Sequence, residues 1–219
     1  MKYLLLENLA ILACSVTGFL SGMRYLSAGK ALYARMIVQG VICVSLGRLY
    51  QCVCLLTGGS LTERYQVGIL GIMGAFSFFF SANYSQIDSL VDDGGKRFRR
   101  YRIIALIGPL CILLMLILIL LSPASVPFKI SCAIVSGMIC PACFYHVKHL
   151  MIPDVDYGVV RCLRGYNALA MMLSVLSMGE LIALAWDAEA LLYGSGAGLC
   201  ALTLALVPVM DRGMKRWRT

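Results

Sequence analysis

The chain contains seven stretches of about 20 mainly apolar residues, and these stretches constrain its fold more than any other feature. A helix needs roughly 20 such residues to cross the hydrocarbon core of a bilayer. The run Ile112–Leu121 is continuously apolar and does not alternate as a barrel strand would. We therefore predict an all-α polytopic integral membrane protein, in which residues 1–219 form one seven-helix transmembrane domain. The predicted spans are 3–25, 32–56, 65–84, 103–121, 126–146, 160–186 and 191–209.

The composition agrees with a membrane protein. Apolar residues make up 60% of the 219 residues, charged residues make up 14%, and the mean hydropathy is +0.84. Soluble domains are about 45–50% apolar and about 25% charged, so an ordinary soluble domain is excluded. A cleaved signal peptide has an apolar region of only about 7–15 residues, so we expect the first stretch to be retained as a span.

The basic residues indicate an orientation. Of the 19 Lys and Arg residues, 15 lie at alternate span ends, around residues 24–35, 96–102, 148–164 and 212–218, and three lie at the opposite ends. Cytoplasmic loops are enriched in Lys and Arg. We therefore expect the N-terminus outside and the C-terminus in the cytoplasm, in a bacterial cytoplasmic membrane. The net charge of +8 then reflects this topology and attraction to anionic lipid headgroups, and nucleic acid is not an expected partner.

Part of this basic set is a candidate contact surface on the cytoplasmic side. Its partners would be anionic headgroups of membrane lipids or a cytoplasmic signalling protein. The sequence does not indicate an oligomeric state. The candidate residues are Lys96, Arg97, Arg99, Arg100, Arg102, Arg161 and Arg164.

Three ionisable residues lie inside the predicted spans, where such groups are costly and often functional. Glu7, Arg48 and Glu180 all fall in the outer half of the bilayer, at depths that allow them to meet. Gln51 and Trp186 lie at neighbouring depths. These five residues are candidates for a ligand-binding pocket open to the outside. The alternative is a buried Arg48–Glu180 pair that fixes the helix register and binds nothing.

No catalytic residue, metal or cofactor is expected. The only two histidines, His146 and His149, are predicted at the headgroup level beside Lys148, which makes a poor zinc site. Cys140 and Cys143 have the CxxC spacing of redox enzymes, but we favour their interpretation as small residues around a proline kink.

The predicted topology and length are similar to those of seven-helix sensor modules, including the N-terminal regions of some bacterial histidine kinases. This resemblance is one of topology and not of motif. It implies a membrane sensor or a membrane-embedded accessory protein, with an outer-leaflet pocket and with signalling or docking through residues 88–102 and 211–218. A small solute transporter or channel is the alternative function, and a lipid-modifying membrane enzyme is the third.

Overall fold

The fold is helical, in agreement with the sequence. The computed structural model describes residues 2–27, 29–88, 92, 94–153 and 158–218, and no β-strand occurs among them. The prediction of an all-α protein is confirmed. The helices are α1 (Lys2–Gly22), η1 (Met23–Tyr25), α2 (Leu32–Leu56), α3 (Ile69–Asn83), the π-helical turn η2 (Tyr84–Asp88), η3 (Lys96–Phe98), α5 (Arg99–Ala105), α6 (Ile107–Leu120), α7 (Val126–Met151), α8 (Val159–Trp186) and α9 (Glu189–Arg218).

Within the described residues, six helical segments are long and apolar enough to cross a membrane, and they indicate an integral membrane protein. These segments are Tyr3–Tyr25, Leu32–Leu56, Lys96–Leu120, Val126–Met151, Val159–Trp186 and Glu189–Arg216. The remaining predicted span corresponds to α3, which has 15 residues before the chain continues into η2. The count of seven spans therefore stays a prediction.

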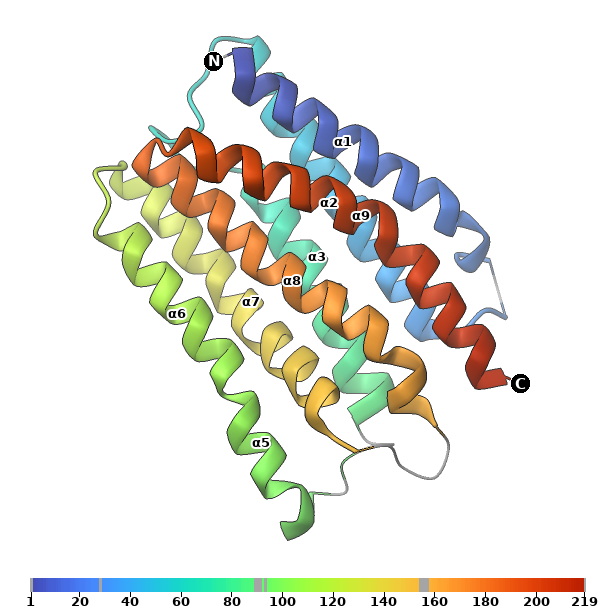
Figure 1. Cartoon of the computed structure of the whole chain (residues 1–219). Coiled ribbons are helices and arrows are strands. Elements are labelled where there is room, and N and C mark those ends of the chain that lie inside the picture. The colour runs from blue at the N-terminus through green and yellow to red at the C-terminus, as the bar shows by residue number, and fades with distance from the viewer. Residues whose placement is uncertain (1, 28, 89–91, 93, 154–157, 219) are drawn as a thin grey trace.

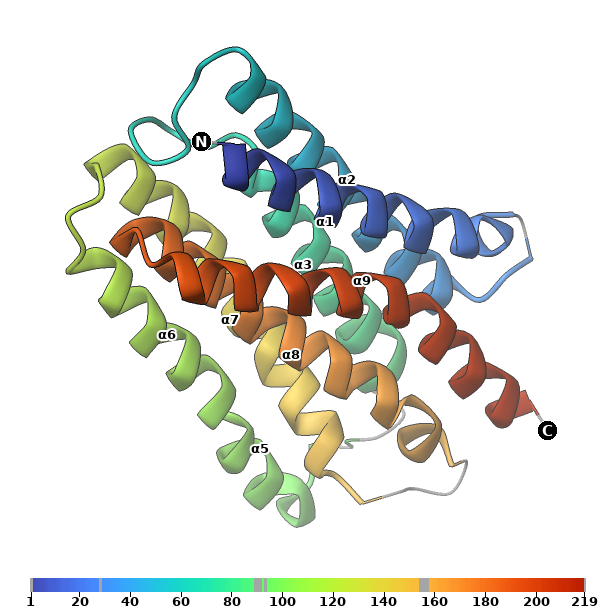
Figure 2. The same ribbon diagram turned by 45° about the horizontal axis from the view of Figure 1, so that its top comes forward.

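The helices form one bundle, with α1 and α6 at opposite edges and with α3 and α8 between them (Figures 1 and 2). One end of the bundle holds the start of α1 and the connections at 57–68, 121–125 and 187–188, and we call it the cavity end. The other end holds η1, η2, η3, the start of α8 and the end of α9, and we call it the basic end. Both chain termini can be followed in Figure 1, one at each end.

Several helices extend further toward the basic end than predicted. Helix α7 continues to Met151 instead of ending near residue 146, and α9 continues to Arg218. Residues Lys96–Arg102, expected in a connection, lie on η3 and α5. Arg and Lys are good helix formers, so the helices do not stop where the apolar runs stop.

Proline explains the break between α5 and α6. Pro109 has no N–H to donate to the carbonyl of Ala105, four residues earlier, so a regular α-helical hydrogen bond is missing there. Helix α5 ends at Ala105, and α6 begins at Ile107. The two helices nevertheless form one long segment along the edge of the bundle (Figure 1).

Glycines bring α2 and α3 into close contact. A Cβ atom added to Gly71 would lie 2.5 Å from Cα of Gly47, and one added to Gly47 would lie 2.5 Å from the carbonyl oxygen of Gly68. Small residues at helix contacts in membrane proteins allow such close approach. The contact aligns α2, which carries Arg48, against the core of the bundle.

Candidate functional site

A buried ionic cluster lies between α2 and α8. Arg48 and Glu180 form a bidentate ion pair, in which Nη1 and Nη2 of the guanidinium group donate to Oε1 and Oε2 of the carboxylate. Each side chain is 3% exposed. Arg48 also donates to Oδ1 of Asn8 at 3.2 Å and to Oε1 of Gln51 at 3.1 Å. Three of the five residues predicted for the pocket, Arg48, Gln51 and Glu180, therefore meet, joined by Asn8.

Glu7 lies beside this cluster but is not hydrogen-bonded to it. Its carboxyl group interacts electrostatically with Glu180 and Arg48, and it packs against Gly196 of α9. Glu7 is 9% exposed, and neither carboxyl oxygen has a hydrogen-bond partner among the described residues. Buried polar atoms without partners are uncommon in folded proteins and call for an explanation. Glu7 is therefore the member of the group whose carboxyl oxygens have no partner among the described residues.

A cavity of about 960 Å³ opens at the cavity end of the bundle. Its walls come from the first turn of α1, the end of α2, the connection at 57–64 and the junction of α8 and α9. The residues that line it are Tyr3, Leu4, Cys54, Leu55, Thr57, Gly58, Gly59, Ser60, Leu61, Thr62, Glu63, Arg64, Pro123, Ala124, Ala183, Leu184, Ala185, Trp186, Asp187, Ala188, Glu189, Leu192 and Tyr193.

The cavity lies directly above the ionic cluster. Three of its lining residues, Leu4, Leu55 and Leu184, are each four residues from a cluster member on the same helix: Asn8, Gln51 and Glu180. Four residues make about one helical turn, or about 5.4 Å. The cavity therefore begins about one helical turn beyond Asn8, Gln51 and Glu180, and none of these three residues lines it.

Trp186 belongs to the cavity and not to the ionic cluster. Its indole is 48% exposed, and its Nε1 donates to the carbonyl oxygen of Leu118 at 3.0 Å. This bond ties the end of α8 to α6. Trp186 was predicted at a depth close to that of Arg48, and the indole lies at the end of α8 beyond Leu184, in the wall of the cavity.

A second buried polar cluster lies toward the basic end. Asn83 of α3 donates to Oδ1 of Asn167 of α8 at 2.9 Å, and its Nδ2 lies 2.7 Å from Nδ1 of His146. His146 is completely buried among the helices, and its depth at the headgroup level stays a prediction. The histidine is buried because α7 continues past it and packs it against α3 and α8. We call Asn83, His146 and Asn167 the histidine cluster.

Nδ1 of His146 contacts both amide side chains. It lies 2.7 Å from Nδ2 of Asn83, which donates, and 3.1 Å from Oδ1 of Asn167, which accepts, so the tautomer of the imidazole decides which of the two contacts is a hydrogen bond. Nε2 of His146 has no hydrogen-bond partner among the described residues. The same holds for Oδ1 of Asn83 and for the hydroxyl group of Tyr166, whose ring centroid lies 5.9 Å from that of His146.

A charged network closes the basic end of the bundle. Lys148 of α7 is 4% exposed and forms ion pairs with Asp88 at 2.6 Å and with Asp92 at 2.7 Å. Nε2 of His149 donates to Asp88 at 3.2 Å, and Arg102 lies 3.6 Å from Asp92. We call these five residues the Lys148 network. His149 is 1% exposed, and its depth at the headgroup level also stays a prediction.

The Lys148 network favours the ionised form of Asp88. Burial disfavours the carboxylate, but hydrogen bonds from His149 and Lys148 outweigh burial and hold the pKa of Asp88 below its usual value. The acidic residues Asp88 and Asp92, spaced by four, could have indicated a partner for Lys148. The apolar pattern predicts that this helix ends at residue 146, before Lys148, so the sequence pattern alone does not relate Lys148 to these two aspartates.

The predicted cytoplasmic contact residues are at the basic end, in two places. Lys96, Arg97, Arg99 and Arg100 are exposed on η3 and the first turn of α5. Arg102 is half-buried and donates to the carbonyl oxygens of Gly94 and Gly95. Arg161 and Arg164 are exposed on the first turns of α8, where Arg164 donates to the carbonyl oxygen of Ile152 at 3.2 Å.

All ten cysteines are free thiols. Cys143 lies against Gly108, and Sγ of Cys140 lies 3.9 Å from the carbonyl oxygen of Pro109, so the CxxC pair packs against α6. In the part of the chain that the structure describes, no three His, Cys, Asp or Glu residues are placed to hold a metal ion together.

Comparison with known proteins adds no family assignment. No protein-family model, no curated protein and no solved structure matches the chain.

Proposed function

We propose that the protein is a membrane-embedded sensor or accessory protein. A ligand enters the cavity from outside the cell, and the effect is read at the basic end in the cytoplasm. The observation that carries this proposal is the cavity of about 960 Å³, which begins about one helical turn beyond Glu180, the partner of Arg48. The orientation rests on the excess of Lys and Arg at the basic end.

The ionic cluster gives such a ligand a means of acting on the bundle. Arg48 joins α2 to α1 through Asn8 and to α8 through Glu180. A ligand that displaces leucine side chains in the cavity wall, or that attracts the unpartnered carboxyl group of Glu7, would change the balance of charges between three helices. A ligand shifts a conformational equilibrium only by its differential affinity for the two states, and a buried charge makes that difference large.

The rim of the cavity favours a cationic ligand with an apolar body. Among the lining residues, Glu63, Asp187 and Glu189 carry negative charge, and Arg64 carries positive charge. Aromatic side chains lie on the same walls, where Tyr3 and Tyr193 make an edge-to-face contact with centroids 6.4 Å apart. Aromatic faces attract cations, and the leucine side chains accept an apolar body.

The tryptophans allow a direct binding test. The chain has two, Trp186 and Trp217, so the W217F variant leaves Trp186 in the cavity wall as its single tryptophan. The probes are tetraphenylphosphonium and tetraphenylborate, a cation and an anion of nearly the same size. We expect saturable quenching of Trp186 by the cation and weaker, unsaturable quenching by the anion. Equal response to both probes, or no saturation with either, would refute the proposed site.

Two rim variants supply the matched controls. Neutralising Glu63, Asp187 and Glu189 together to Gln, Asn and Gln should weaken binding of the cation. The R64Q variant should strengthen it, because the same rim then loses its positive charge. Both effects should shrink when the salt concentration rises, since rim charges are screened by ions.

A small transporter is the second candidate, favoured by the histidine cluster. Polar side chains are buried at two depths, around Arg48 and around His146, as they are along proton and ion pathways in membranes. The test is proton flux into liposomes that contain the protein. Flux above that of protein-free liposomes, lost in the H146F variant, would favour transport over sensing.

A further inference from the structure

A groove lies on the surface of the bundle at the basic end, between α5 and α7. Its volume is about 440 Å³, and Arg99, Arg102, Ile103, Leu106 and Phe144 line it. Ile103 and Leu106 are more than half exposed, and Phe144 of α7 is half-buried. The groove is thus lined by apolar side chains with arginine at one end. It lies at the opposite end of the bundle from the cavity of about 960 Å³.

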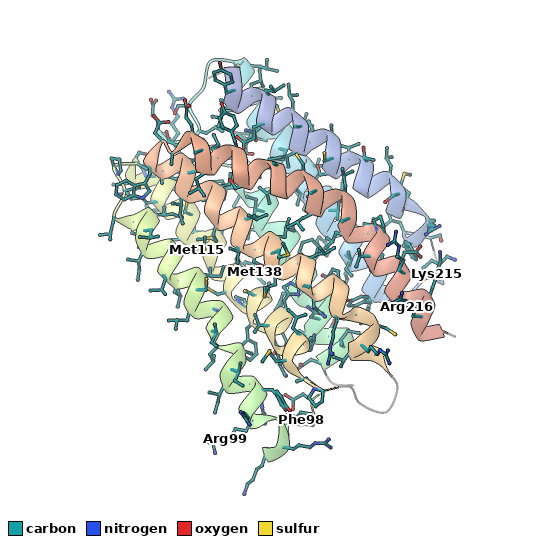
Figure 3. The ribbon with its side chains drawn as sticks, in the orientation of Figure 1. Phe98, Arg99, Met115, Met138, Lys215 and Arg216 are labelled. Atoms are coloured by element: carbon teal, nitrogen blue, oxygen red, sulfur yellow. The ribbon has the colours of Figure 1, made fainter. Side chains whose placement is uncertain are left out.

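The two arginines of the groove have different roles. Arg102 is held by the carbonyl oxygens of Gly94 and Gly95 and by Asp92, so its guanidinium group fixes the chain before α5. Phe98 is buried and anchors the same turn. Arg99 is exposed on the first turn of α5, as Figure 3 shows beside Phe98. Arg99 is therefore the cation available to a molecule in the groove.

The spacing of the lining residues matches an amphipathic molecule. Arg99, Ile103 and Leu106 are four and then three residues apart, so they follow one face of the helical segment. A molecule whose polar group binds Arg99 can therefore place an apolar tail over the side chains of Ile103 and Leu106. The turn around Arg99 also carries Lys96, Arg97 and Arg100 and no acidic residue, so the bound group is an anion.

We propose that this groove binds one anionic phospholipid of the surrounding membrane. Its phosphate group binds Arg99, and an acyl chain lies over Ile103 and Leu106 against Phe144. The apolar face of α6 continues the same surface through the exposed side chains of Ile107 and Leu110. An arginine holds phosphate through several donors.

Lipid retention in native mass spectrometry tests this site. The detergent-purified protein is offered phosphatidylglycerol or phosphatidylcholine with identical acyl chains, and glycerol phosphate serves as the soluble anion. We expect one phosphatidylglycerol molecule to be retained at least about tenfold better than phosphatidylcholine, because the trimethylammonium group of phosphatidylcholine would lie beside the positive charges of Lys96, Arg97 and Arg100. Equal retention of the two lipids would overturn the proposal. Full competition by glycerol phosphate would also overturn it, since it assigns the site to a soluble anion.

Three variants separate a built site from general attraction. R99Q removes the phosphate partner, and L106W fills the groove without changing the charge. R212Q removes the same charge from an exposed position on α9, at the same end of the bundle but outside the groove. We expect R99Q and L106W to lose the retained lipid and R212Q to keep it. Equal losses in R99Q and R212Q would mean diffuse electrostatic attraction and would overturn the proposal.

A second groove variant protects the test against misfolding. If L106W is not recovered as a monodisperse protein, I103W fills the same groove one turn nearer to Arg99. Ile103 is 57% exposed, so a larger side chain there meets few neighbours. Retention of phosphatidylglycerol by a well-folded I103W protein would place the lipid elsewhere and contradict the proposed groove.

Discussion

Arg48 and Glu180 face each other across the bundle, from α2 and α8, with both ends of the guanidinium group bound to the two carboxylate oxygens. Both side chains are almost completely buried. Removing one partner of such a pair leaves the other as an uncompensated buried charge, at a cost of about 3–5 kcal/mol. The pair is therefore a point at which a small change in charge has a large effect on the bundle.

Arg48→Ala should destabilise the protein strongly, because Glu180 and Glu7 then lose their common cation. The measurement is the melting temperature in detergent micelles. Arg48→Met combined with Glu180→Leu should recover much of the loss, since apolar side chains of similar volume often replace a buried pair without cost.

A matched control is Arg24→Ala, which removes an exposed arginine from its ion pair with the largely buried Asp211. Asp211 keeps its contacts with Tyr25 and Lys215, and an exposed arginine contributes little to an ion pair, so this variant should melt close to the native protein. Equal melting temperatures for Arg48→Ala and Arg24→Ala would show that the Arg48–Glu180 pair does not hold the helices together.

The contact between α2 and α3 leads to a second prediction. Gly71→Ala places a methyl group against the backbone of Gly47, and overpacking of this kind costs about 1–3 kcal/mol. Gly194→Ala is the comparison, because a Cβ at Gly194 meets nothing within 4 Å and alanine favours a helix. Thermal melting of both variants decides the matter: Gly71→Ala should fall and Gly194→Ala should not. The same shift in both would contradict the close contact.

The histidine cluster predicts coupling between α3 and α8. Asn83→Ala removes the Nδ2 donor that lies against Oδ1 of Asn167 and Nδ1 of His146, and loss of a buried hydrogen-bond partner costs about 1–3 kcal/mol. Asn167→Ala should be milder in the Asn83→Ala background than in the native protein. A double-mutant cycle measured by unfolding gives the coupling, expected at about 0.5–3 kcal/mol. Additive effects would mean that the two side chains act independently.

The Lys148 network predicts a dependence on acid. The pKa of Asp88 is lower in the folded protein than its usual value of about 3.9, so the stabilisation is complete above that value and is lost as the pH falls through the folded pKa. The difference in melting temperature between the native protein and Asp88→Asn should be constant above about pH 7, where His149 beside Asp88 is neutral, and should shrink as the pH falls below about 4. A difference that grows as the pH falls below about 4 would contradict this sign.

The sequence was sufficient to predict the ionic cluster but not the other polar groups. Arg48 and Glu180 stand alone in long apolar runs, and counting residues from the span ends places them at one depth. Lys148 and His146 lie near the end of an apolar run, where a solvated position is the simpler expectation. Their burial follows from five further residues of α7, which the apolar pattern alone does not indicate.

Contacts between distant segments account for the rest. The cavity combines the first turn of α1 with the connection at 57–64 and the junction of α8 and α9, and no local pattern relates these segments. The Trp186 indole binds a backbone carbonyl, which carries no sequence signature. Gly47 is likewise a single glycine whose role depends on Gly68 and Gly71 of another helix.

Hydrogen–deuterium exchange of the W217F variant, with and without saturating tetraphenylphosphonium, tests most directly whether events in the cavity reach the basic end. We expect altered exchange around residues 57–64 and 183–193, and also in η2 and around Lys148, at the opposite end of the bundle. Changes confined to the cavity end would contradict the proposed sensor function, because the protein would then bind a molecule without any effect at the basic end.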